Sequence, residues 1–199
     1  MSERFVDVWF DPSCPLTWNT AQWIWNVADV LPITPRWHIM SLAVLNEHRE
    51  KDPEGDEEGY LWMPVRICAA VEHHHGQTGL ADFYAALGRW LHGDGDVGPE
   101  TFPGALTEAG LPTELAAAAG SNEYDDAVRR SHAEGIGLVG DHVGTPVVAT
   151  TYRGRQVAWF GPVLTRVPRG DAAAQLFDAV VTVVGTEGFH EIKTRPVVP

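Results

Sequence analysis

The order of strand-like and helical segments constrains the fold of this chain most strongly. Arg4–Phe10 is rich in β-branched and aromatic residues and predicts a short buried strand. Residues 15–30 carry apolar side chains at steps of three and four, which predicts a helix, and Arg36–Leu42 predicts a second strand. A strand, a helix and a strand in succession form a right-handed crossover, so we expect these two strands to be parallel.

No strand is predicted between residues 59 and 146. Asn46–Gly59 is a charged connection, and helical segments follow it at Val65–His75, Leu80–Leu91, Pro99–Ala109, Thr113–Ala119 and Glu123–Ile136. Pro146–Tyr152 and Gln156–Phe160 predict a hairpin, and Asp171–Val184 predicts a closing amphipathic helix. We expect one α/β domain over residues 1–199, with an all-helical insertion at about residues 60–138, because helices inserted within one sheet motif belong to that motif's domain.

Charge and cysteine content exclude several classes of function. The chain has 199 residues and a formal net charge of −13, which argues against nucleic-acid binding because that requires clustered Lys and Arg. No apolar stretch approaches the length of about 20 residues that a membrane helix needs, and residues 1–7 resemble no secretory leader, so we expect a cytoplasmic protein without a membrane partner. Two cysteines, Cys14 and Cys68, are too few for a disulfide scaffold or a cysteine-based zinc site.

The sharpest local feature is the sequence DPSCPLT at residues 11–17. It places Cys14 where the first strand gives way to the first helix, and Pro15 takes the first helical position, where its missing N–H costs nothing. The N–H groups and the dipole of a helix start favour a thiolate, so we expect the pKa of Cys14 to be lowered, with Thr17 donating a hydrogen bond to the sulfur. The alternative is that Cys14 is an inert, small apolar residue.

A second feature is the sequence Gly144-Thr145-Pro146, in which a proline opens a strand. Proline cannot donate to a sheet ladder and is tolerated there only at an edge or in a special turn. The X-Pro bond is also the one peptide bond for which the cis form costs little. Taken alone, this motif leaves the bond before Pro146 either cis or trans, and most such bonds are trans.

Together these features resemble the DsbA-like thioredoxin superfamily, in which a Cys-Pro-x-Cys helix start faces a cis-proline loop and a helical insertion splits the fold. The chain is more closely similar to the actinobacterial mycothiol-dependent nitroreductase group. Four blocks carry the resemblance: WFDPxCP at 9–15, MSLAVLNE at 40–47, GTP at 144–146 and FGPVLTRVPRG at 160–170. The resemblance implies a thioredoxin-like β-α-β and β-β-α fold, mycothiol as cosubstrate, and a small nitroaromatic or other electrophile as acceptor. It also implies a cis bond before Pro146, with Thr145 offering backbone groups to an extended thiol substrate.

The chain departs from this group at the second cysteine. Thr17 stands in its place, and Leu16 stands where an aromatic residue is often found. Cys68 lies in an apolar helical stretch that predicts buried filler, so a mixed disulfide on Cys14 must be released by an outside thiol. This favours monothiol oxidoreductase chemistry with a low-molecular-weight thiol. The alternatives are a transferase or isomerase that uses a bound cosubstrate thiol, and a binding protein without catalysis.

Weaker candidates surround this motif. Asn46 lines a pocket beside Cys14 or belongs to a solvated loop, and Trp62 forms either an aromatic wall for a flat substrate or part of the core. His38 is either a sheet-face histidine or an acid–base group near the thiol. His73, His74 and His75 point in different directions on a helix, so we expect no metal site there.

The expected small-molecule partners are a low-molecular-weight thiol and an electrophile. We expect no bound NAD or flavin, because the Gly-x-Gly sequences lack the strand–turn–helix context of a dinucleotide site. Two-fold dimers are the commonest assembly, which makes a homodimer the default expectation.

Overall fold

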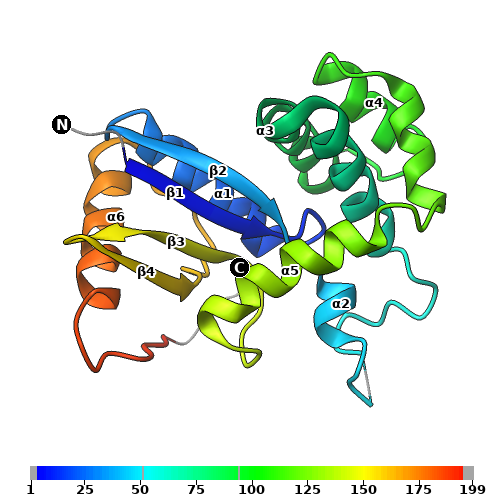
Figure 1. Ribbon diagram of the computed structural model, residues 1–199. Coiled ribbons are helices and arrows are strands. Elements are labelled where there is room, and N and C mark those ends of the chain that lie inside the picture. The colour runs from blue at the N-terminus through cyan, green and yellow to red at the C-terminus, as the bar shows by residue number, and fades with distance from the viewer. Residues whose placement is uncertain (1–3, 51, 94, 195–199) are drawn as a thin grey trace.

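The computed structural model describes residues 4–50, 52–93 and 95–194, and its centre is a four-stranded sheet in the order β2-β1-β3-β4 (Figure 1). The strands are β1 (Arg4–Phe10), β2 (Ile33–Ile39), β3 (Val147–Tyr152) and β4 (Arg155–Phe160). β1 and β2 are parallel, which confirms the predicted crossover, whereas β3 is antiparallel to both β1 and β4. The pairing of Trp9 with Val147 brings the end of β1 beside the start of β3.

Helices cover both faces of this sheet (Figure 1). α1 (Pro15–Ala28) and α6 (Gly170–Val184) pack together on one face, and α5 (Asp125–Val139) crosses the other. Gly135 of α5 lies against the ring of Trp9, where a Cβ atom would stand 2.7 Å from the ring Cγ atom. The absence of a side chain at this position therefore lets α5 approach β1.

The remaining helices lie between β2 and β3 in the chain. They are α2 (Leu42–Asn46), α3 (Trp62–His92), α4 (Thr101–Glu108) and the 3₁₀ helix η1 (Thr113–Gly120). α3, α4 and η1 pack on one another, and α3 also packs on β2. This is a thioredoxin-like α/β fold with a helical insertion, as the sequence predicted.

Two predicted boundaries around the second strand are wrong. β2 begins at Ile33 rather than Arg36 and includes Pro35, which a sheet tolerates here because β2 is an edge strand. Leu42 starts the short helix α2 instead of ending a strand, and the Ser41 hydroxyl caps this helix by accepting the Val44 N–H at 3.3 Å. The predicted break between two helical segments is confirmed, because α3 is interrupted at Gly76, whose φ of 66° and ψ of −164° are not helical.

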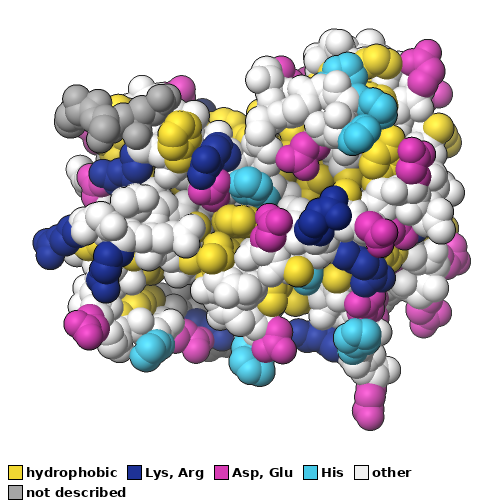
Figure 2. Space-filling model, in the orientation of Figure 1, with side chains coloured by type: hydrophobic (Ala, Val, Ile, Leu, Met, Phe, Trp, Pro, Cys, Tyr) yellow, Lys and Arg dark blue, Asp and Glu magenta, His cyan; other side chains and the backbone are white. Residues whose placement is uncertain are grey.

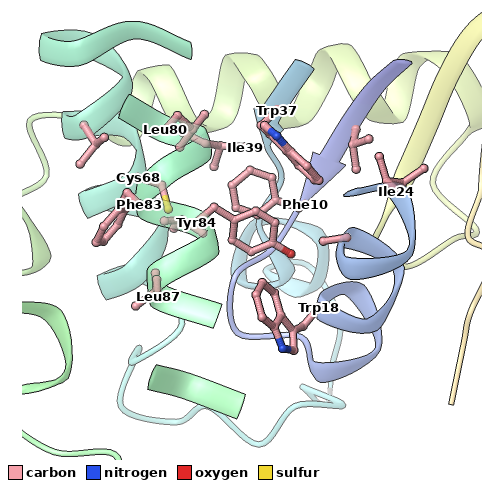
Figure 3. Close-up of a cluster of buried hydrophobic side chains, with 14 of the residues drawn as sticks. Phe10, Trp18, Ile24, Trp37, Ile39, Cys68, Leu80, Phe83, Tyr84 and Leu87 are labelled. Carbon is pink, nitrogen blue, oxygen red and sulfur yellow. The ribbon is translucent and has the colours of Figure 1, made fainter. Parts of the chain in front are cut away.

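An aromatic core fills the space between the sheet, α1 and α3 (Figure 3). Phe10 of β1 and Tyr84 of α3 stack with their ring centroids 3.7 Å apart, and Trp18 and Trp37 meet Tyr84 edge-on. Trp18 also lies flat on Gly88, where a Cβ atom would come within 2.2 Å of the indole. The core thereby fixes the start of α1 against the second half of α3.

The surface shows no segregation of charge by sign in the view of Figure 2, where basic side chains are interspersed with acidic and uncharged ones. The whole chain has 27 acidic and 14 basic residues, which gives the formal net charge of −13. Within residues 4–50, 52–93 and 95–194, no helix carries an apolar stretch long enough to cross a membrane.

A candidate thiol site at the start of helix α1

Cys14 is the residue that precedes the first turn of α1. Its backbone is extended, with φ −82° and ψ 114°, and its carbonyl accepts the first helical hydrogen bond, from the Trp18 N–H at 3.0 Å. The loop before it is closed by the Cys14 N–H, which donates to the Asp11 carbonyl at 3.2 Å. Cys14 is half-buried, and Pro15 and Leu16 beside it are exposed, so small molecules can reach this end of α1.

Burial raises the pKa of the Cys14 thiol. The hydroxyl and the backbone N–H of Thr17 oppose this rise, whereas the nearby carboxylate of Asp11 adds to it. The lowered pKa expected from the sequence is therefore wrong. The motif indicated the donors at the helix start, but neither the desolvation of the sulfur nor the buried charge behind it could be read from the sequence pattern.

A pair of buried threonines lies behind the sulfur. The hydroxyl oxygens of Thr17 and Thr145 are 2.8 Å apart, and the Thr145 hydroxyl accepts the Asp11 N–H at 3.1 Å. Either hydroxyl of the pair can donate to the other. When Thr145 donates to Thr17 and Thr17 donates to the Cys14 sulfur, all three hydrogen bonds point toward the sulfur, which favours its ionised form.

Thr145 belongs to a proline loop at the same end of the sheet. The Thr145–Pro146 peptide bond is cis, and so is Gly161–Pro162, which no sequence argument indicated. The Gly161 N–H donates to the Pro146 carbonyl at 2.8 Å and joins the two turns. The fold thus brings Cys14, Thr17 and the residues around Pro146 together from opposite halves of the chain.

Polar side chains of α1 hold the segment that follows β4. Thr20 donates to the Pro162 carbonyl at 2.6 Å, Asn19 donates to the Leu164 carbonyl at 2.9 Å, and Asn26 donates to the Pro168 carbonyl at 2.9 Å. These bonds join the segment at residues 160–170 to the helix that begins directly after Cys14.

Asp11 is a buried acidic residue that the sequence analysis quoted within a motif but gave no role. It is fully buried, its Oδ1 accepts the Ser13 N–H at 2.7 Å, and its Oδ2 accepts the Leu42 N–H at 2.7 Å. Burial raises the pKa of Asp11 to about 6, although both N–H groups act to lower it. The available signal was its position, an acidic residue directly after an apolar strand.

Two predicted pocket residues lie in helices α2 and α3 of the insertion. Asn46 is buried at the end of α2, the helix whose first residue is bound by Asp11. Trp62 is half-buried, and the guanidinium carbons of Arg66 and Arg129 lie 5.0 and 5.2 Å from its ring centroid. Trp62 therefore packs against cations, which leaves less of its ring for a flat substrate.

The histidines take no part in a metal cluster. The His38 Nε2 atom is 2.8 Å from the Asp7 carboxylate, which also binds Arg36, and its ring stacks on Trp9. This is the sheet-face interpretation of His38. In the described parts of the chain, no group of three or more His, Cys, Asp or Glu side chains is arranged to hold a metal ion.

A cavity of about 390 Å³ lies between α1 and the end of α3, next to the Cys14 loop. We call it the α1–α3 cavity, and it is lined by Pro15, Trp18, Asn19, Gln22, Arg89, His92 and Gly93. The His92 Nε2 atom donates to the Pro12 carbonyl at 2.8 Å and ties the end of α3 to the loop that precedes the thiol. No sequence pattern indicates this cavity, because its two walls are far apart in the chain.

These features define the class of the protein: a thioredoxin-fold protein of the DsbA-like kind, with a Cys-Pro helix start facing a cis-proline turn. Residues 13–194 match the model of the Rv2466c-like family, described as mycothiol-dependent nitroreductase Rv2466c, and the chain belongs to this family. Both resemblances inferred from the sequence are thereby confirmed. The chain is also 32% identical to the uncharacterized protein Rv2286c of Mycobacterium tuberculosis, over 98% of this chain and 83% of that protein.

Solved structures share the fold at low identity. A putative protein disulfide isomerase from Nitrosomonas europaea has a TM-score of 0.57 and 16% identity, covering 91% of this chain and 98% of that one. The cytosolic disulfide reductase DsbM from Pseudomonas aeruginosa has a TM-score of 0.55 and 15% identity, covering 89% and 98%. A 2-hydroxychromene-2-carboxylate isomerase has a TM-score of 0.59 and 15% identity, covering 89% and 93%. At identities of 15–16%, these neighbours show the fold that the chain shares with them.

Proposed function

We propose that this protein is a cytoplasmic monothiol oxidoreductase that uses Cys14 and mycothiol to reduce a small electrophile such as a nitroaromatic compound. The placement of Cys14 carries this proposal: it is accessible at a helix start, with the hydroxyl of Thr17 where a dithiol site would hold its second sulfur. Family membership supports mycothiol as the reductant.

The proposed reaction has two steps. In the first, the thiols of Cys14 and one mycothiol supply an electron pair to the nitro group. The nitro group loses one oxygen and becomes a nitroso group, and that oxygen combines with the two thiol hydrogens to form water. The two sulfur atoms join in a mixed disulfide. In the second, the thiolate of another mycothiol attacks the mycothiol sulfur, breaks the S–S bond and leaves as mycothiol disulfide, while the expelled Cys14 thiolate takes up a proton.

The surroundings of Cys14 make the second step dependent on an outside thiol. Thiols of high pKa are poor leaving groups, so the raised pKa of Cys14 lengthens the lifetime of its mixed disulfide. Cys68 is fully buried in the core and offers no accessible sulfur for an internal attack. The hydroxyl of Thr17 would stabilise the Cys14 thiolate as it leaves.

A second candidate is a thiol-dependent transferase or isomerase. The raised pKa favours it, because a neutral Cys14 thiol and the Thr17 hydroxyl would hydrogen-bond to the sulfur of a bound cosubstrate and polarise it. In that reaction Cys14 forms no covalent intermediate. Replacement of its sulfur by a hydroxyl would then preserve much of the activity.

One experiment separates these candidates. The reduced protein is incubated with mycothiol disulfide and weighed by mass spectrometry, and nitroaromatic consumption in the presence of mycothiol is then followed for the wild type, Cys14→Ser and Cys68→Ser. We expect one mycothiol adduct and turnover in the wild type and Cys68→Ser, and neither in Cys14→Ser. Turnover retained in Cys14→Ser would support the transferase or isomerase, and no exchange above background in the wild type would leave a binding protein.

A further inference from the structure

Two successive backbone N–H groups at the junction of β2 and α2 are held by titratable side chains. The Ser41 N–H donates to the Nδ1 atom of His132 at 3.3 Å, and the Leu42 N–H donates to the Oδ2 atom of Asp11 at 2.7 Å. All four residues are buried, so neither N–H can turn to water without a local opening of the fold. The chemistry proposed above uses neither bond.

His132 can hold the Ser41 N–H only in its neutral form. Because a backbone N–H can only donate, Nδ1 carries no proton, and the proton of the neutral ring lies on Nε2. An imidazolium ion has a proton on both nitrogens and accepts no hydrogen bond. Burial lowers the pKa of His132 below its ordinary value of 6.5, so the ring is neutral at neutral pH and takes up its second proton in mild acid.

Asp11 responds to acid in the same direction. Its two oxygens accept one N–H each, from Ser13 and from Leu42. A protonated carboxyl group keeps only one good acceptor oxygen, so the proton weakens one of these two bonds. Burial raises the pKa of Asp11 to about 6, which places this change close to that of His132. Because Ser41 and Leu42 are neighbours, release of one N–H group frees the backbone that carries the other.

Helix α5 also holds the far end of α2 (Figure 1). Arg129, one turn before His132, binds the carboxylate of Glu47 at 2.7 Å. Arg129 adds to the lowering of the His132 pKa, and Glu47 opposes it. The charged and titratable groups near Asp11 are Glu54, Cys14, Cys68 and Tyr84. The ion pair thus keeps the end of α2 attached to α5 when its start is released.

We propose that His132 and Asp11 form an acid-sensitive clamp, which holds the start of α2 against the Cys14 loop at neutral pH and releases it in mild acid. Asp11 belongs to that loop, because its carbonyl accepts the Cys14 N–H at 3.2 Å. Release therefore removes the Leu42 donor from the carboxylate behind the thiol and changes the surroundings of Cys14. The clamp is independent of the reaction, whereas its effect on turnover rests on the proposed function.

Amide hydrogen exchange followed by NMR tests the clamp directly. Protection factors, which correct for the intrinsic pH dependence of exchange, are measured in the full-length protein at about pH 7.5 and about pH 5. We expect the protection of Ser41 to fall about tenfold, as the loss of one buried hydrogen bond predicts, and that of Leu42 about threefold, because Asp11 keeps one acceptor. The Met40 N–H donates to the backbone carbonyl of Phe10 at 2.8 Å and should keep its protection.

Two variants separate the titration of His132 from its role as acceptor. His132→Asn offers an amide oxygen in place of Nδ1 and does not titrate, so the protection of Ser41 should change less than about twofold with pH. His132→Leu has no acceptor and should show the low protection of Ser41 already at neutral pH. His142→Asn, at an exposed histidine, is the matched control and should behave as the wild type. Thermal unfolding checks that each variant is folded.

Constant protection of Ser41 in the wild type, or an equal fall in His132→Asn, would overturn the clamp. Long-range proton–nitrogen NMR that placed the proton of the neutral ring on Nδ1 would also overturn it, and this measurement needs no variant. Nitroaromatic turnover with mycothiol, normalised to its rate at neutral pH, should fall about threefold less with acid in His132→Asn than in the wild type. Equal losses of turnover would refute the link between the clamp and the thiol. A wild type that loses protection but shows no turnover at any pH would refute the proposed function and leave the clamp supported.

Discussion

The two cysteines of this chain have the same chemistry and opposite surroundings. Cys14 begins α1 and is half-buried, whereas Cys68 lies within α3 and is fully buried in the aromatic core (Figure 3). Burial raises the pKa of both thiols, and the charge of Asp11 adds to the rise in each. Only Cys14 has hydrogen-bond donors that oppose the rise, from Thr17 and Leu16.

This comparison shows that the direction of a pKa shift does not distinguish the candidate reactive thiol from the structural one. What separates them is access from solvent and a set of donors directed at the sulfur. Cys68 has neither, so ionisation there would leave a charge among apolar side chains.

The largest contrast is expected in thiol reactivity. Cys14→Ser should slow alkylation of the native protein by iodoacetamide by more than about a hundredfold, equivalent to about 3 kcal/mol in the barrier, because Cys68 is inaccessible. Cys68→Ser should leave the rate unchanged. The wild-type rate should rise with pH, with its midpoint above the ordinary value of 9.0, since burial raises the pKa of Cys14. A midpoint below that value would refute the description of the site.

Asp11, which acts on both thiols, should also make stability depend on pH. Its pKa rises from 3.8 to about 6 on folding, so its contribution is fully present below pH 3.8 and is lost as pH rises through about 6. This shift corresponds to about 3 kcal/mol. Urea unfolding should show the wild type losing about that much stability relative to Asp11→Asn between pH 4 and pH 7. Parallel stability curves for the two proteins would contradict this.

A smaller effect, with the order of the two cysteines reversed, is expected in stability. Cys68→Ser should lower the free energy of unfolding by about 2 kcal/mol, because it places a hydroxyl without a partner in an apolar core. Cys14→Ser, at a half-buried position, should change it by less than about 0.5 kcal/mol. Denaturant titration measures both. If the two variants proved equally stable, the core assignment of Cys68 would be wrong.

The smallest effects are expected from the threonine pair. Thr17→Val removes a donor to the sulfur and should slow alkylation of Cys14 at neutral pH about fivefold, as one hydrogen bond of about 1 kcal/mol predicts. Thr145→Val removes the donor to Thr17 together with the acceptor of the Asp11 N–H, and it should slow alkylation about twofold, because it leaves the direct contact of Thr17 with the sulfur in place. Thr182→Val, whose hydroxyl bonds only to the Asp178 carbonyl on α6, serves as control. Faster alkylation in Thr17→Val would contradict the proposed direction of its hydrogen bond.

Much of the fold could be predicted because its signals are local. The apolar run Arg4–Phe10 and the periodic stretch after Pro15 gave the first strand and helix, and the hairpin around Arg153 was equally clear. α2 was missed because five residues are too few for a helical period, and its cap at Ser41 depends on burial. The start of β2 was misplaced because prolines at 32 and 35 indicate a break unless the strand is known to be an edge.

The candidate site could be predicted only where its parts are neighbours in the chain. Cys14, Pro15 and Thr17 form one motif, but the contact of Thr17 with Thr145 spans 128 positions, and that of His92 with Pro12 spans 80. The rise in pKa at Cys14 comes from desolvation, which depends on the packing of the whole fold. Asp11 could be read from the motif, whereas its complete burial depends on the packing of the fold around it.

The contact between Trp18 and Gly88 also limits how this protein can evolve. Because a Cβ atom at position 88 would lie 2.2 Å from the indole, a larger residue there requires the ring of Trp18 to shift. A mutation of Gly88 is therefore tolerated best after one that makes residue 18 smaller. Trp18 also borders the α1–α3 cavity, so this first mutation widens the cavity. A change in the volume of the α1–α3 cavity is thus linked to a change in the spacing of α1 and α3.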